Sequence, residues 1–132
     1  MERIVDARDL SGVLTPSLSP VEQAVLLVTG RTLGRGEEDL GKKLMRSFLF
    51  NLSQREGVVK TIVLINSGVL LAIEGSDVVE YLMTLERSGV EVLSCNACLD
   101  YYRVREKLMV GTVTNMYNVI DLLANAYKVI TV

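Results

Sequence analysis

Lys60-Thr61-Ile62-Val63-Leu64-Ile65, followed directly by Asn66-Ser67-Gly68, is the stretch of sequence that decides the fold. Its aliphatic residues follow one another without the polar alternation that a strand exposed on one face would show. Unbroken Val, Ile and Leu runs are typical of strands buried on both faces of a parallel sheet. The Asn-Ser-Gly triplet favours a turn. We therefore expect a buried strand over residues 60–65 that ends at this triplet.

The alternation of apolar strands with amphipathic helices continues in both directions from this stretch. Right-handed crossovers between such strands produce a parallel sheet that helices cover on both faces. We therefore predict an α/β fold, a flavodoxin-like three-layer sandwich with a mostly parallel five-stranded sheet. The strands are expected at 21–29, 60–65, 90–93, 110–114 and 128–132, and the helices at 37–55, from Ser76 or Asp77 to 88–89, at 99–109 and at 115–126.

The chain is organised as an arm and one domain. Pro16 and Pro20 bias the residues before them away from helix, so residues 1–20 are predicted to be an N-terminal arm or linker. Residues 21–132 are predicted to form the domain. No charged and then apolar leader opens the chain, which favours a cytoplasmic location.

Composition argues against two classes of partner. A net charge of −2 and 5% aromatic residues give no basic face with stacking platforms, so no nucleic-acid partner is predicted. A membrane span needs about 18 or more consecutive apolar residues. The longest apolar candidate, Thr61–Ile73, is shorter and contains Asn66, Ser67 and Gly68. No membrane association is predicted.

Cys95 and Cys98 are the only cysteines, and the chain has no histidine. They follow a predicted strand and precede a predicted helix, where a thiol pKa can be lowered and a thiolate becomes reactive. Burial of both sulfurs in the core is the alternative. Two thiolates do not complete a tetrahedral zinc site, so no metal is predicted, although four thiolates shared between subunits stay formally open. No other cofactor is predicted.

Ligands of open parallel sheets bind beyond the carboxyl ends of the strands, at a topological switch point. Three loops should meet there, namely 30–36, 66–68 and 95–98. The glycine loop matches neither nucleotide-binding fingerprint and could simply shape a turn, as could the Asn-Ser-Gly triplet. The candidate binding residues in these loops are Gly34, Arg35, Gly36, Asn66, Ser67, Gly68 and Asn96.

Several segments resemble one family. They include Gly34-Arg35-Gly36-Glu37-Glu38-Asp39-Leu40-Gly41, Ile65-Asn66-Ser67-Gly68-Val69, Ser94-Cys95-Asn96-Ala97-Cys98-Leu99-Asp100-Tyr101-Tyr102 and Val113-Thr114-Asn115-Met116-Tyr117. Over about residues 21–132, the chain resembles the DsrE/DsrF-like superfamily. Within it, the chain is most similar to the carboxyl-terminal domain of YedF-type sulfurtransferase-like proteins of selenium metabolism.

This resemblance implies a flavodoxin-like fold and a homo-oligomer, which we expect to be a dimer, trimer or hexamer. It implies that Cys95 accepts a persulfide and that Cys98 is the second cysteine of the pattern. Residues 5–12 echo the opening of a TusA-like domain without its Cys-Pro pair. A separate TusA-like protein is therefore expected as sulfur donor or acceptor.

The function that follows is a persulfide carrier or sulfurtransferase-like protein in sulfur or selenium metabolism. Cys95 would carry the outer sulfur, while Asn96 and Ser67 could hydrogen-bond to it. Cys98 would then attack Cys95 or tune its pKa. Two alternatives stay open: a thiol–disulfide oxidoreductase that uses the same two cysteines, and a non-catalytic oligomeric binding or regulatory module.

Overall fold

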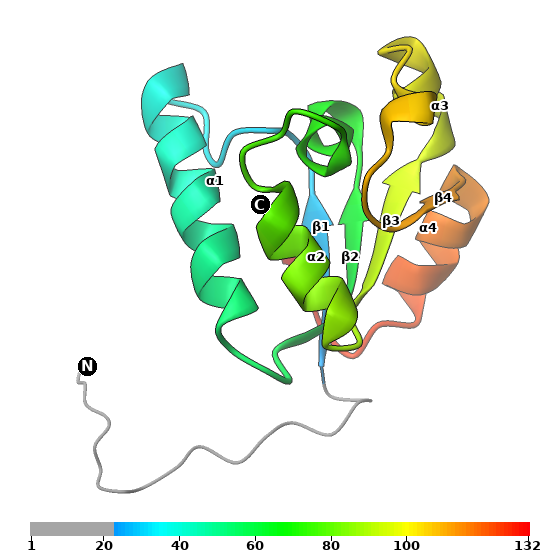
Figure 1. Cartoon of the computed structure of the whole chain (residues 1–132). Coiled ribbons are helices and arrows are strands. Elements are labelled where there is room, and N and C mark those ends of the chain that lie inside the picture. Colours follow the sequence, from blue (N-terminus) through cyan, green and yellow to red (C-terminus); the bar gives the residue numbers. More distant parts are fainter. Residues whose placement is uncertain (1–22) are drawn as a thin grey trace, which may run out of the picture.

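The computed structural model describes residues 23–132, which form one sheet with helices on both of its faces (Figure 1). The sheet has five strands in the order β4-β3-β2-β1-β5, and every neighbouring pair is parallel. The predicted arm at 1–20 lies outside the described residues. The strands are β1 (Ala24–Val28), β2 (Val59–Leu64), β3 (Glu91–Cys95), β4 (Thr112–Thr114) and β5 (Val129–Thr131).

Four α-helices and two 3₁₀ segments connect the strands. The helices are α1 (Glu38–Ser53), α2 (Val79–Arg87), α3 (Asn96–Tyr101) and α4 (Met116–Ala124), and the 3₁₀ segments are η2 (Asn66–Ala72) and η3 (Arg105–Lys107). Asn115 caps α4, because its side chain accepts a hydrogen bond from the backbone N–H of Asn118. None of the helices within residues 23–132 is long and apolar enough to cross a membrane.

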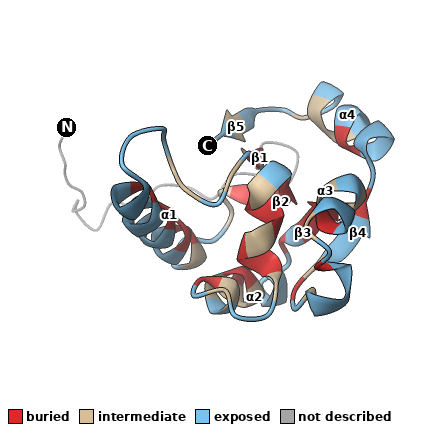
Figure 2. Cartoon of the chain, turned by 90° about the horizontal axis from the view of Figure 1, so that it is seen from above, coloured by how far each residue is buried: buried red, intermediate tan, exposed pale blue. Residues whose placement is uncertain are grey.

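The helices divide unequally between the two faces of the sheet. Seen from above, α1 and α2 cover one face and α4 covers the other (Figure 2). The predicted α/β class with a five-stranded parallel sheet is confirmed. The strand order differs from the 2-1-3-4-5 order of flavodoxin, because β1 lies between β2 and β5.

The strand order places the switch point of the sheet between β3 and β4. Leu99 of α3 belongs to the core on the α1–α2 face, whereas Val119 of α4 belongs to the core on the opposite face. The chain therefore leaves two adjacent strands, β3 and β4, toward opposite faces. Ligand crevices of open α/β sheets form at such points.

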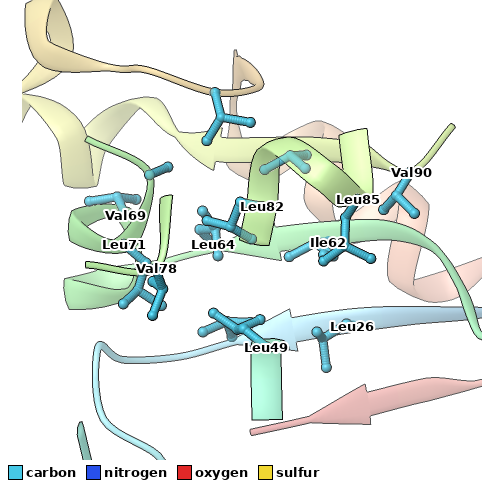
Figure 3. Close-up of a cluster of buried hydrophobic side chains, with 14 of the residues drawn as sticks. Leu26, Leu49, Ile62, Leu64, Val69, Leu71, Val78, Leu82, Leu85 and Val90 are labelled. Carbon is cyan, nitrogen blue, oxygen red and sulfur yellow. The ribbon is translucent and has the colours of Figure 1, made fainter. Parts of the chain in front are cut away.

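Two apolar cores hold the layers together. The larger core lies between the sheet and the helices α1 and α2, where Leu26, Leu49, Ile62, Leu64 and Leu82 are fully buried (Figure 3). The smaller core lies under α4 and centres on Val25, Val63 and Val119. Adjacent residues of β1 and β2 alternate between the two cores, as expected for strands buried on both faces.

Three element boundaries near the cysteines differ from those predicted. The third strand continues to Cys95 instead of ending at Leu93. The helix expected at 99–109 is the short α3 followed by η3. The Asn-Ser-Gly triplet opens the 3₁₀ segment η2, whose Val69, Leu71 and Ala72 are buried. Burial of these apolar side chains favours a packed helical turn over an exposed loop.

Candidate functional site

The two cysteines lie at the junction of β3 and α3, and both are free thiols. Cys95 is the last residue of β3 and is only 2% exposed. Cys98 lies three positions further, in the first turn of α3, and is partly exposed. The structure therefore gives the two sulfurs different access to solvent.

A cavity of about 560 Å³ adjoins Cys98 at the carboxyl ends of the strands. Its walls come from η2, α3 and α4, so it occupies the switch point between β3 and β4. In Figure 1, η2 (green) and α3 (yellow) lie above the sheet at this end. Cys95 does not line the cavity. The lining residues are Ile65, Asn66, Ala97, Cys98, Tyr101, Tyr102 and Met116.

Asn66 supplies a directed polar contact to the Cys98 sulfur. Its backbone N–H donates a hydrogen bond to Cys98 Sγ over 3.0 Å. Asn66 has a φ of 53°, a left-handed conformation that asparagine tolerates better than most residues. Its side-chain oxygen accepts the N–H of Ser67 over 2.8 Å, which supports this conformation. The turn at the end of β2 therefore aims a backbone donor at the sulfur.

Three effects compete to set the pKa of Cys98, and their balance raises it above the ordinary cysteine value. Burial raises the pKa most, the hydrogen bond from the Asn66 backbone lowers it, and the neighbouring Cys95 thiol raises it again. The two thiols are therefore close enough to interact. Cys98 is mostly protonated at neutral pH, and its thiolate forms as the pH rises.

This balance predicts how Cys98 reacts with an alkylating reagent. We expect the iodoacetamide rate of Cys98 to rise with pH through a midpoint above that of an ordinary cysteine. Cys95→Ala removes a neighbour that raises the pKa of Cys98, so the midpoint should move to lower pH. Alkylation reactions that are quenched at successive times and analysed by peptide mass spectrometry give the rate of Cys98 against pH for both proteins. An unchanged or higher midpoint in Cys95→Ala would contradict the coupling.

Ser67 and Gly68 hold the loops together, and neither of them lines the cavity. Ser67 Oγ accepts the backbone N–H of Arg31 over 3.0 Å. Gly68 packs so closely on β1 that an added Cβ would lie 2.8 Å from the carbonyl oxygen of Val28 and 3.5 Å from the nitrogen of Gly30. The glycine loop therefore contacts the site through residues 30 and 31.

The remaining predicted binding residues lie away from the cavity wall. Gly34, Arg35, Gly36 and Asn96 are not among the residues that line it. Asn96 instead accepts the N–H of Ala97 with its side-chain oxygen over 2.7 Å. Of the three expected loops, the structure brings the Asn66 turn and the cysteine segment together at Cys98.

Sequence reasoning missed the aromatic and thioether part of the wall. Tyr101 and Tyr102 follow Cys98 at helical spacing of three and four, which could have placed them beside it. Their rings pack edge to face, with centroids 5.2 Å apart and an interplanar angle of 89°. Met116 belongs to α4. It is distant in sequence from the other lining residues, and the tertiary structure brings it to the cavity.

A second cavity of about 550 Å³ lies between α4 and the sheet. It contains charged side chains, Lys60, Glu91 and Asp121, and neither cysteine. Within residues 23–132, His, Cys, Asp and Glu side chains form no cluster of three that could hold a metal ion. We place the candidate chemistry at Cys98, where a nucleophile, a directed donor and a cavity coincide.

Comparison with known proteins identifies a family and a set of similar folds. A sequence model of the DsrE/DsrF-like family matches residues 33–132. No curated protein matches the chain in sequence.

Several solved structures share the fold, and they include the following three. The crystal structure of the ychN protein from E. coli has a TM-score of 0.64 and 18% identity, over 83% of this chain and 99% of that one. The protein of unknown function MTH1491 from Methanobacterium thermoautotrophicum has a TM-score of 0.62 and 16% identity, over 83% and 98%. The conserved protein of unknown function BT1422 from Bacteroides thetaiotaomicron has a TM-score of 0.56 and 19% identity, over 82% and 94%.

Proposed function

Because the chain belongs to the DsrE/DsrF-like family, we propose that it carries sulfur as a cysteine persulfide in a cytoplasmic sulfur or selenium relay. The observation that carries this proposal is Cys98 itself. It is partly exposed at the wall of a 560 Å³ cavity, and a backbone N–H lies 3.0 Å from its sulfur. A directed N–H stabilises the negative charge of a thiolate.

The proposal assigns the carrier role to Cys98 in place of the Cys95 expected from the family pattern. A sulfur that attacks a donor must be reached by it, and Cys95 is 2% exposed and outside the cavity wall. Thiol exchange depends on access as well as on thiolate character. Cys95 is better placed as the partner of Cys98.

The transfer step is a displacement at sulfur. The Cys98 thiolate attacks the outer sulfur of a donor R–S–SH, its S–S bond breaks, and R–S⁻ leaves while Cys98–S–SH forms. An acceptor thiolate then takes the same outer sulfur and releases the Cys98 thiolate. No electrons are lost overall, so the relay needs no oxidant. Because the pKa of Cys98 is raised, we expect sulfur uptake to become faster as the pH rises.

Cys95 provides a second exit for the sulfur. Its thiolate can attack the inner sulfur of Cys98–S–SH, which forms a Cys95–Cys98 disulfide and releases HS⁻. A thiol reductant must then restore the two thiols. The interaction of the two cysteines also favours a second candidate function, thiol–disulfide exchange, in which the disulfide itself is the working state.

Mass spectrometry after incubation with a persulfide donor tests the carrier role. We expect the wild type and Cys95→Ser to gain 32 Da, the mass of one sulfur, on Cys98, and Cys98→Ser to gain nothing. Passage of the added sulfur to a second thiol distinguishes the carrier from a simple exchange protein. Loss of the adduct only in Cys95→Ser would return the carrier role to Cys95.

Native thiol labelling tests the non-catalytic alternative. A binding or regulatory module would leave both cysteines resistant to iodoacetamide in the folded protein, whereas the carrier must label at Cys98. Failure of Cys98 to label or to gain sulfur under any donor would contradict the proposed function.

Assembly and partners are part of the proposal. We propose a homo-oligomer that exchanges sulfur with a TusA-like protein. Exposed apolar side chains on α4, namely Met116, Tyr117 and Ile120, support self-association. Light scattering on the purified chain and sulfur transfer from a persulfidated TusA-like protein are the direct measurements.

A further inference from the structure

The cavity beside Cys98 is built without formal charge. Among residues 23–132, the six lining residues other than Cys98 are aliphatic, aromatic, amide or thioether side chains. The second cavity differs sharply, because Lys60, Glu91 and Asp121 line it. An ion that gives up water against these residues meets no side chain of opposite charge to compensate it.

The charged residues nearest in sequence to the wall are already engaged or lie outside it. Arg105 binds the Asp100 carboxylate through two nitrogens, each 2.9 Å from an oxygen. This contact lowers the pKa of Asp100. The two residues form an ion pair whose net charge is zero. Arg103 follows Tyr102 in the chain but does not line the cavity. Among residues 23–132, the wall therefore offers an anion no free cation.

Two features of the wall favour an apolar group instead. The edge-to-face pair of Tyr101 and Tyr102 presents aromatic surface, and Met116 adds a thioether, which packs well against aromatic rings. A volume of about 560 Å³ falls in the range of small-molecule sites.

We propose that Cys98 takes its sulfur from a small organic persulfide whose carbon group is uncharged and apolar, and that it discriminates against anionic donors. This inference rests on the proposed function of Cys98 as sulfur acceptor. The uncharged group packs on Tyr101, Tyr102 and Met116, while the outer sulfur meets the Cys98 sulfur beside the Asn66 N–H. The displacement then proceeds as described above, with R–S⁻ leaving.

A matched pair of donors tests the preference. Benzyl persulfide and 4-carboxybenzyl persulfide differ by one carboxylate remote from the reacting sulfur. Single-turnover rates of the 32 Da gain on Cys98 are divided by the rates with N-acetylcysteine amide, which corrects for intrinsic reactivity. We expect the neutral donor to be faster by about tenfold, since an unpaired charge costs at least that factor in an apolar site.

Two arginine variants test whether the cavity wall is what discriminates between the two donors. Tyr101→Arg adds a cation to an exposed position of the cavity wall and should raise the corrected rate of the carboxylated donor at least severalfold. Tyr127→Arg adds the same charge at a residue that is 64% exposed and outside the wall, and should leave the ratio near that of the wild type.

The outcomes separate the two levels of the proposal. Equal corrected rates for the two donors, or equal effects of the two arginine variants, would overturn the donor preference and leave the carrier function standing. No sulfur gain on Cys98 from either donor, while N-acetylcysteine amide reacts with both, would overturn the carrier function and the preference with it.

Discussion

Gly111→Ala is expected to lower the free energy of unfolding by about 3–4 kcal/mol, from the sum of backbone strain and steric overlap. Gly111 has a φ of 81°, where a Cβ is strained by about 1–2 kcal/mol. The added Cβ would also overlap the carbonyl oxygen of Val92 and lie 2.9 Å from its carbon. Both atoms belong to β3 and cannot move without disturbing the pairing of Val92 with Ile62 of β2.

Gly75→Ala is the matched control for this prediction. Gly75 has a φ of 91°, but no atom of the described residues 23–132 lies within 4 Å of an added Cβ. It should therefore lose only the conformational part, about 1–2 kcal/mol. Urea unfolding curves of the wild type and both variants give the comparison. Equal losses of unfolding free energy in the two variants would show that the contact with β3 does not affect stability.

Gly68→Ala is expected to cost about 2 kcal/mol by overpacking and also to change the chemistry of Cys98. The residue has no left-handed φ, so the cost is steric. Its Cβ would lie 2.8 Å from the carbonyl oxygen of Val28, which moves η2 away from β1. Asn66 opens η2 and donates to Cys98. Weakening that hydrogen bond should raise the pKa of Cys98 further and slow its alkylation at neutral pH.

Gly36→Ala is the control, because it also removes a glycine from a loop that was predicted to bind the ligand. In the part of the chain that the structure describes, nothing lies within 4 Å of its added Cβ, and its φ is not left-handed. Stability and alkylation rate should both stay close to those of the wild type. A normal alkylation profile in Gly68→Ala, despite lower stability, would separate the packing of η2 from the reactivity of Cys98.

The sheet could be predicted because its strands are buried on both faces. Runs such as Val25-Leu26-Leu27-Val28 and Ile62-Val63-Leu64 have no polar alternation, and both proved to be central strands. The strand order was not predictable from these runs. Whether β5 pairs with β1 or with β4 depends on which face α4 crosses, and that choice rests on tertiary packing.

The position of the cysteine site could be predicted from the sequence, but not which of the two sulfurs is accessible. Strand ends are uncertain by one or two residues, and here that margin decides access to the sulfurs. Because β3 continues to Cys95, the Cys95 side chain follows the alternation of the strand and is buried in the sheet. Cys98 falls on a helical turn and meets the cavity. Met116 could not be foreseen at the wall, because it arrives from a different element.

The position of β1 between β2 and β5 has a consequence for the synthesis of the chain. Thr29 donates to the Val132 carbonyl from both its backbone and its hydroxyl, across a separation of 103 residues. While a ribosome is still making the residues between them, one edge of β1 lacks the strand that finally covers it. Unpaired edges recruit other chains. Nascent copies of this protein are therefore most exposed to edge-to-edge association just before residues 129–132 emerge.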